Sequence, residues 1–253
     1  MTTLLVDIGN TRMKWALLRG ARLSRPRAVV HDGDGARLRA ALRSVPRDVG
    51  CAVAVCVAGT RLERALAAAV RARLGIPTEF ARSSRRALGV QNGYRDVWRL
   101  GADRWVGLIA AHAIAGSRPV LIANVGTALT LDLVDAAGVH LGGAIAPGPS
   151  TMIASLLGGT AGIRRRARGA RRAAGTARGL FAPDTASALD AGARFAAAAL
   201  IDRAALEARA ALGRRPLVLL TGGAVTGLKT HIKSAAREIP DLVLRGLGLL
   251  ARG

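Results

Sequence analysis

The stretch LLVDIGNTRMKWALL, residues 4–18, is an apolar run that ends on an acidic residue, turns, and resumes with a lysine inside it. Apolar residues on both sides of the turn predict two strands, residues 3–8 and 12–18, paired as a hairpin. An acidic residue at the end of a buried strand, here Asp7, needs a chemical reason. Glycine at position 9 marks a tight turn whose backbone can approach a bound group closely.

The side chains around this turn indicate what that group is. Asn10 and Thr11 offer polar donors next to the backbone N–H groups of the turn, and Lys14 adds a positive charge suited to a β- or γ-phosphate. Asp7 then fits a carboxylate facing hydrated Mg²⁺. A single turn of this kind is also compatible with an ordinary Gly-Asn hairpin, so the interpretation depends on the rest of the chain.

A second stretch follows the same pattern. PVLIANVGTALTLDLVD, residues 119–135, again gives an apolar strand, a polar residue (Asn124), a Gly-Thr turn and a returning strand. Repeated units of this kind predict two similar halves. Gly, Ser and Pro cluster at residues 115–119, so we expect a first domain over residues 1–117 and a second over residues 118–253.

The remaining pattern alternates strands and helices, as in an α/β protein. Further strands are expected at residues 27–33, 49–59, 78–82, 138–148 and 216–223, and helices at residues 36–45, 60–75 and 102–116. The remainder after residue 148 is expected to be mostly helical, broken by the strand at residues 216–223, and it ends with the apolar segment 240–251.

Composition limits the classes of function. The chain has 253 residues, 51% of them hydrophobic, and no apolar run long enough to span a bilayer. The first residues lack the features of a secretory signal, and Cys51 and Cys56 lie on opposite faces of a predicted strand, so we expect a cytoplasmic protein with two free thiols. The net charge is +22, but aromatic residues make up only 3%. Nucleic acid is therefore not the expected partner.

LGADRW, residues 100–105, is the next candidate site. Gly101 permits a close approach, Ala102 leads into a helix, and Asp103 and Arg104 occupy its first turn. Asp103 can act as a general base toward a substrate hydroxyl, and Arg104 can bind a carboxylate or amide oxygen. The alternative is that Asp103 only stabilises the start of the helix.

Together, DIGNTRMK, GADR and the later Gly-Thr turn resemble the type III pantothenate kinases of the actin-like ATPase superfamily. The resemblance runs in order along almost the whole chain. It implies an α/β fold of two similar actin-like (ribonuclease H-like) domains, each a mixed sheet flanked by helices, with an ATP cleft between them. It also implies phosphorylation of pantothenate by ATP in the first step toward coenzyme A, with Mg²⁺, a monovalent cation (K⁺ or NH₄⁺) and a homodimer.

The resemblance also implies roles for individual residues. Asp103 would accept the proton, and Asp7 would hold Mg²⁺ through water. The pantothenate site would be lined by Tyr94, Gly101, Ala102, Asp103, Arg104 and Thr185. ATP would be bound by Asp7, Ile8, Gly9, Asn10, Thr11, Arg12, Met13, Lys14 and Thr127.

Three features depart from the family pattern. Asn124 stands where the family usually has an aspartate, which removes the charge expected to hold the monovalent cation. Ala224 stands where an acidic residue often follows two glycines near the adenosine. The segment IRRRARGARR, residues 163–172, is more basic than in the family and is expected to be a solvated loop. The histidines show no metal-ligand spacing: His31, His112, His140 and His231.

Two alternatives remain open from the sequence. One is a kinase of the same superfamily that acts on another small hydroxy acid or sugar. The other is a nucleotide-binding regulator without turnover, which Asn124 and Ala224 would favour. Asp103 together with Lys14 favours an enzyme, because a regulator would need neither a base nor a phosphate-binding cation.

Overall fold

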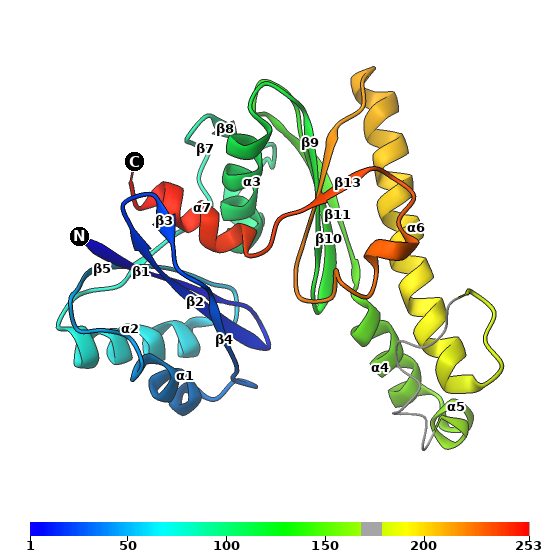
Figure 1. Ribbon diagram of the computed structural model, residues 1–253, viewed down its shortest axis with the longest axis horizontal. Coiled ribbons are helices and arrows are strands. Elements are labelled where there is room, and N and C mark those ends of the chain that lie inside the picture. The colour runs from blue at the N-terminus through cyan, green and yellow to red at the C-terminus, as the bar shows by residue number, and fades with distance from the viewer. Residues whose placement is uncertain (168–178, 253) are drawn as a thin grey trace. The chain divides into compact units, whose positions relative to one another are not determined.

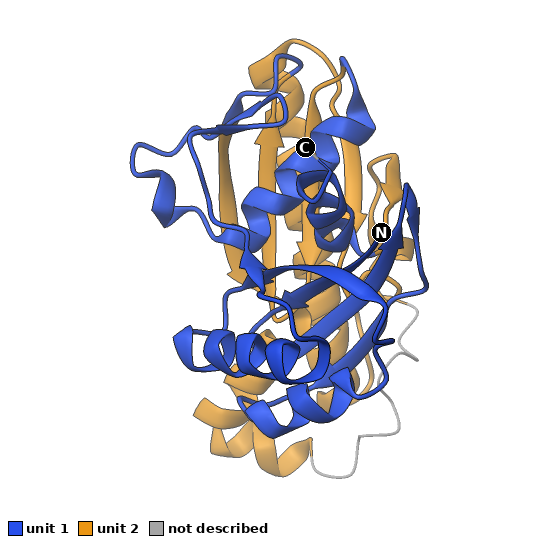
Figure 2. Ribbon diagram, turned by 90° about the vertical axis from the view of Figure 1, so that its left-hand side faces the viewer, with its two compact units in different colours: residues 1–117, 136–140, 241–253 blue, residues 118–135, 141–240 orange. Residues whose placement is uncertain are grey.

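The computed structural model describes residues 1–167 and 179–252 (Figure 1). The described chain divides into two compact units, each of which is considered by itself (Figure 2). Unit 1 comprises residues 1–117, 136–140 and 241–253, and unit 2 comprises residues 118–135 and 141–240. No helix among the described residues is both long enough and apolar enough to cross a membrane.

Unit 1 contains a mixed sheet with helices on both faces (Figure 1). Its elements are β1 (Thr2–Ile8), β2 (Arg12–Arg19), β3 (Arg22–Leu23), β4 (Arg27–Val30), α1 (Gly35–Leu42), β5 (Val49–Cys56), α2 (Thr60–Leu74), β6 (Glu79–Phe80), β7 (Arg86–Ala87), β8 (Val90–Gln91), the 3-10 helix η1 (Val97–Arg99), α3 (Ala102–Ala115) and α7 (Leu242–Leu250). The strand order is β3-β2-β1-β5-β6, and β4 also pairs with β2.

Unit 2 contains a second mixed sheet. Its elements are β9 (Val120–Val125), β10 (Ala128–Val134), β11 (His140–Pro147, of which His140 is grouped with unit 1), α4 (Pro149–Gly159), α5 (Ala161–Arg166), α6 (Thr185–Leu212), β12 (Leu217–Thr221), the 3-10 helix η3 (Lys229–His231) and β13 (Ala236–Glu238). The strand order is β11-β10-β9-β12-β13.

The two sheets repeat one topology. In unit 1, β1 pairs antiparallel with β2 and parallel with β5, which pairs parallel with β6. In unit 2, β9 pairs antiparallel with β10 and parallel with β12, which pairs parallel with β13. The repeat predicted from the two Gly-Thr turns therefore extends to the strand order of both sheets.

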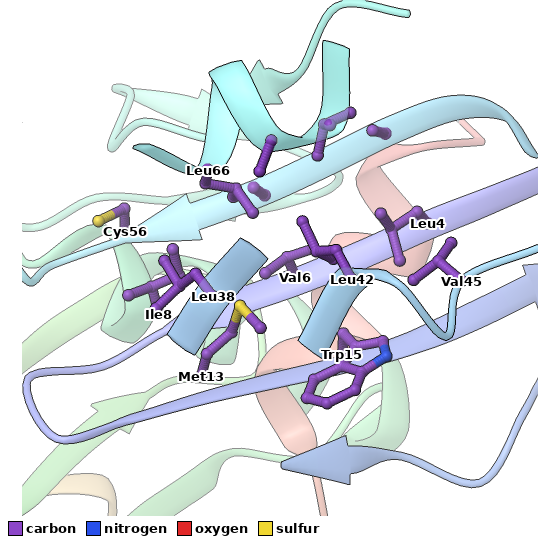
Figure 3. Packing of buried hydrophobic residues seen from close by; sticks show 14 of the residues in the cluster. Leu4, Val6, Ile8, Met13, Trp15, Leu38, Leu42, Val45, Cys56 and Leu66 are labelled. Carbon is purple, nitrogen blue, oxygen red and sulfur yellow. The ribbon is translucent and has the colours of Figure 1, made fainter. Parts of the chain in front are cut away.

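The alternation of side chains along β1 divides the core of unit 1 into two layers. Leu4, Val6 and Ile8 face α1 and α2, with Leu38 and Leu66 among the contacting side chains (Figure 3). Leu5 lies on the opposite face in a cluster with residues of α3 and α7, including Val106, Leu244 and Leu247. In unit 2, a third cluster joins β9, β10 and β12 to α6.

Most predicted elements are confirmed. The helix predicted to end at Gly75 does so, with Gly75 in the left-handed region at φ 74°. Both cysteines are free, and they pack into different layers, as expected from their spacing on β5. The sequence did not predict the two-residue strands β3, β7 and β8, nor β13, because such short pairings carry almost no periodicity.

Candidate active site

The first Gly-containing turn joins β1 to β2. The Gly9 N–H donates to the Arg12 carbonyl at 3.0 Å, which closes the turn. Asp7 lies directly opposite Lys14 in the β1–β2 register, so both side chains project from the same face of the sheet. The turn therefore places a carboxylate and a lysine side by side at the end of the hairpin.

Asp7 lies in an unusual electrostatic environment. Burial raises the pKa of its carboxyl from 3.8 to about 7. The neighbouring carboxylates of Asp103 and Asp241 also raise this pKa, whereas Lys14 lowers it. Carboxylates from three separate segments of unit 1 and one lysine thus influence one another electrostatically around Asp7.

The partner of Lys14 was not predicted. Its Nζ donates to Asp241 Oδ1 at 2.9 Å, and both side chains are largely buried. The lysine proposed to bind phosphate thus also pairs with a carboxylate of its own unit. Asp241 directly precedes α7 and has a left-handed backbone, with φ 56°. It is 227 residues from Lys14 along the chain, so no local pattern could have linked the two.

Asp103 and Arg104 occupy the first turn of α3, as predicted. Asp103 Oδ1 accepts the N–H of Arg104 at 2.8 Å, so the helix-stabilising role considered as the alternative is also present. A Cβ on Gly101 would lie 2.8 Å from the same oxygen, which explains why a residue without a side chain precedes the helix here. Asp103 is only partly buried and can thus be reached by a ligand.

Tyr94 packs beside Arg104 in the same unit. Arg104 Nη1 donates to the Tyr94 hydroxyl at 3.2 Å, and its guanidinium lies 5.7 Å from the tyrosine ring centre. The His140 ring stacks on the Tyr94 ring, with the two ring centroids 5.6 Å apart. Arg85 donates to the Tyr94 carbonyl at 2.8 Å and thereby fixes the loop. The sequence predicted Tyr94 and Arg104 but not the supporting Arg85 and His140.

The second Gly-containing turn, between β9 and β10, lies in unit 2. Gly126 N–H donates to the Ala128 carbonyl at 2.9 Å, which repeats the first turn with one residue fewer. The Thr127 carbonyl accepts the N–H of Gly148 at 2.9 Å and the hydroxyl of Thr151 at 2.6 Å. The start of α4 therefore fixes the orientation of this turn.

Asn124 and Ala224, two of the departures from the family pattern, are close to each other in unit 2. Ala224 N–H donates to the carbonyl of Val125, the residue after Asn124, at 3.1 Å. Between them Gly222 has φ +104°, and a Cβ there would lie 2.7 Å from Asn124 Oδ1. The backbone after β12 therefore approaches Asn124 so closely that only glycine fits.

The other predicted residues fall in different surroundings. Thr185 begins α6 and lines an apolar pocket of about 380 Å³ together with Met152, Ile153 and other residues of α4 and α6. Ile8 and Met13 are fully buried core side chains, so only their backbone atoms are available to a ligand. In the basic segment 163–172, residues up to 166 are helical rather than loop, and residues 168–172 lie outside the described residues.

Two mixed sheets with one repeated topology, each flanked by helices, give the chain the fold of the actin-like ATPases. A crystal structure of a putative Baf family transcriptional activator from Campylobacter jejuni shares this fold, with a TM-score of 0.61, 20% identity, and coverage of 98% of this chain and 97% of that one. The family model for type III pantothenate kinase matches residues 3–207, and the chain belongs to this family.

Curated relatives agree over nearly the full length. The type III pantothenate kinase of Alkalilimnicola ehrlichii is 38% identical over 250 residues, which cover 98% of this chain and 97% of the relative. That of Methylibium petroleiphilum is 40% identical over 265 residues, covering 99% and 98%. The chain is accordingly a kinase that phosphorylates pantothenate in coenzyme A biosynthesis. The assignment supports pantothenate as the substrate. It does not support the two alternatives, a kinase of another small hydroxy acid or sugar and a regulator without turnover.

Proposed function

We propose that Asp103 is the proton acceptor when the terminal hydroxyl of pantothenate attacks the γ-phosphorus of ATP. The new bond joins the hydroxyl oxygen to phosphorus, the bond to the β-phosphate oxygen breaks, and ADP leaves. The hydroxyl proton passes to the carboxylate. The observation that carries this role is the position of Asp103, partly exposed at the start of α3 and electrostatically coupled to Asp7 at the first turn.

The pantothenate site is proposed to use the group around Tyr94. Arg104 donates to the tyrosine hydroxyl, and a guanidinium is the group best suited to bind a carboxylate or amide oxygen of the substrate. Its side chain is held by the tyrosine ring and is 9% exposed, so little conformational entropy is lost on binding. Thr185, which lines the α4–α6 pocket, is proposed as a further substrate contact from the family resemblance.

For ATP we propose contacts with the first turn, residues 7–14, and with Thr127 of the second turn. Asn10 would offer its backbone N–H, and Asn10 and Thr11 would offer side-chain donors, to phosphate oxygens. Gly9, whose own N–H closes the turn, would let those oxygens approach the backbone closely. Lys14 would stabilise the negative charge that spreads over the transferring group. Its existing pair with Asp241 keeps the ammonium group oriented before the nucleotide arrives.

We propose a divalent cation near Asp7 that is bound mainly through its own waters, because among the described residues no group of three or more His, Cys, Asp or Glu side chains could hold a metal ion. Burial is the main cause of the raised pKa of this carboxyl, and Asp103 and Asp241 raise the pKa further while Lys14 lowers it. Mg²⁺ prefers such oxygen ligands, mostly through its own waters, and when bound it would neutralise charge on the phosphates. Asp7 is the proposed ligand, through water.

The monovalent-cation site fits less well. Asn124 supplies a neutral amide oxygen, and a partly dehydrated K⁺ or NH₄⁺ is costly to hold without a formal charge. Asp132 lies on the same face of the sheet, two residues beyond the partner of Asn124 on β10, but it is 3% exposed. We therefore propose that this enzyme depends only weakly on a monovalent cation.

We also propose a cytoplasmic homodimer. In unit 2, apolar side chains are exposed on the edge strand β11 and on α4: Leu141 is 50%, Ile145 64% and Leu156 44% exposed. An exposed edge strand with apolar side chains is a common pairing surface. Light scattering coupled to size-exclusion chromatography tests this directly, because a monomer of 26.1 kDa would contradict it.

The experiment that tests the proposed chemistry measures ADP release in a coupled assay with and without pantothenate. Wild-type protein should release ADP only when pantothenate is present. Asp103→Asn keeps the shape of the side chain but removes the proton acceptor, and it should lower kcat by about 10²- to 10⁴-fold with ATP binding retained. Turnover within threefold of wild type would exclude Asp103 as the base.

A further inference from the structure

His31 is a fully buried histidine directly after β4, and the proposed chemistry does not use it. Its Nε2 lies 2.8 Å from the Gly9 carbonyl oxygen, and its Nδ1 lies 3.0 Å from the Gly33 backbone nitrogen. The Gly33 N–H can only donate, so Nδ1 carries no proton. The Gly9 carbonyl can only accept, so Nε2 carries one. The two contacts together define a neutral imidazole in the Nε2–H tautomer.

The same residue also holds the turn through its backbone. The His31 N–H donates to the Thr11 carbonyl at 3.0 Å. Two of the turn's carbonyls, those of Gly9 and Thr11, are thus bound by one residue. On the far side His31 is itself fixed, because its carbonyl accepts the N–H of Asp34 at 2.6 Å and its ring accepts the N–H of Gly33. The turn is thereby anchored to the start of α1.

The direction of the Gly9 carbonyl decides the direction of the next N–H. A trans peptide unit is planar, and its C=O and N–H point to opposite sides. Because the imidazole holds the Gly9 oxygen inward, the Asn10 N–H points away from His31. Among the described residues no hydrogen bond to this N–H is present, and Asn10 is exposed. The outward N–H is a donor available to an anion.

The second turn supports this interpretation. There the Thr127 carbonyl is held by the Gly148 N–H and the Thr151 hydroxyl. Both Gly-containing turns therefore have a carbonyl bound by a side chain of the segment that packs behind them, His31 at the first turn and Thr151 at the second.

We infer that His31 is a positioning residue for the transferred phosphates: it holds the Gly9 carbonyl inward so that the Asn10 N–H donates to ATP. This inference rests on the proposed role of residues 7–14 in binding the nucleotide. It assigns no contact between His31 and substrate. The effect of losing it should appear in ATP affinity, because the misdirected donor faces the nucleotide and not pantothenate.

Two substitutions separate the two ring nitrogens. The amide nitrogen of a glutamine can occupy roughly the place of Nε2, so His31→Gln keeps the donor to Gly9 and loses the acceptor for Gly33. The shorter asparagine reaches only the place of Nδ1, so His31→Asn keeps the acceptor and loses the donor. A positioning role predicts that His31→Asn is the more damaging to ATP binding, whereas a purely structural anchor at Gly33 predicts the reverse.

The measurement is the Kd of a non-hydrolysable ATP analogue by calorimetry, together with kcat and both KM values. His31→Asn should weaken the analogue about tenfold, which is the loss of about one hydrogen bond, and His31→Gln about threefold or less. The KM for pantothenate should stay within twofold in both. Asp34→Ala is the matched control, since it removes the α1 cap, lowers the melting temperature, and leaves the Gly9 contact intact.

Lys14→Ala in the same experiment separates two failures. If Lys14→Ala weakens the analogue and His31→Asn does not, the inference about His31 is wrong while the proposed phosphate turn stands. If neither variant weakens it, the proposed function of residues 7–14 fails as well. If Asp34→Ala weakens the analogue as much as His31→Asn does, the effect is loss of stability alone and the positioning role is overturned.

Discussion

Replacing Asp7 by asparagine should stabilise the ligand-free protein at alkaline pH even though it removes a proposed Mg²⁺ ligand. The carboxyl has a pKa of about 7 in the folded protein, against 3.8 for an ordinary aspartate, because it is buried near Asp103 and Asp241. A carboxyl with a raised folded-state pKa favours folding at low pH. That contribution is fully present below pH 4 and is lost as the pH rises through 7.

The size of the effect follows from the pKa difference. Each unit of pKa difference between the folded and unfolded states corresponds to about 1.36 kcal/mol. With a folded-state pKa of about 7 against 3.8, ionisation of Asp7 should lower the unfolding free energy by about 4 kcal/mol between pH 4 and pH 8. A neutral amide of similar shape does not titrate and carries no such cost. Wild-type protein should therefore lose up to about 4 kcal/mol more unfolding free energy between these pH values than Asp7→Asn does.

Urea denaturation of both proteins at pH 4 and pH 8, with the slope checked for two-state behaviour, measures this difference directly. The matched control is Asp48→Asn, since Asp48 has a 64% exposed side chain and only a distant pairing with Arg19 at 3.8 Å. Its pH dependence should equal that of wild type. If Asp7→Asn shows the same pH dependence as wild type, the burial and charge argument for Asp7 is refuted.

Three further predictions concern residues of the two turns and the backbone that packs against the second. Lys14→Ala should weaken ATP at least tenfold and pantothenate hardly at all, because the ammonium group is proposed to meet only phosphate; equal losses in calorimetry would contradict the assignment. Asn124→Asp should create or strengthen activation by K⁺, measured against a bulky organic cation at matched ionic strength, and strong K⁺ activation of wild type would oppose the argument. Gly222→Ala should lower the unfolding free energy by more than about 2 kcal/mol and lower the melting temperature with it, because Gly222 has a positive φ and its backbone lies against Val125. An unchanged melting temperature would show that the backbone there can move.

The sequence predicted those parts of the fold and site that have a local signal. The β1–β2 hairpin, its repetition as β9–β10, and the start of α3 at Ala102 all follow from glycine placement and strand periodicity within a few residues. Asp7 and Asp103 could be named because an acidic residue at a strand end or helix start is chemically conspicuous. The raised pKa of Asp7 could not be predicted in this way, since it depends on burial and on carboxylates from segments that meet only in the folded unit.

What the sequence missed has long-range causes. Asp241 pairs with Lys14 although 227 residues separate them, and His140, which stacks on Tyr94, is the first residue of β11. His31 was treated as an ordinary histidine because it has no metal-ligand spacing, yet its two ring nitrogens bridge Gly9 and Gly33. Because the partners of this buried imidazole are backbone groups, no pattern of side chains in the sequence predicts its contacts.

The composition of unit 1 from three chain segments has a consequence for biosynthesis. The sheet that contains β1 is covered on one face by Leu244 and Leu247 of α7, which are translated long after it because the residues of unit 2 lie between them in the chain. Until they emerge, Leu5 and its neighbours lack that cover, and Lys14 lacks Asp241. Unit 1 therefore cannot complete its fold until unit 2 has been synthesised. During this interval apolar side chains of the sheet are exposed, and the nascent chain is prone to aggregation and is a substrate for chaperones.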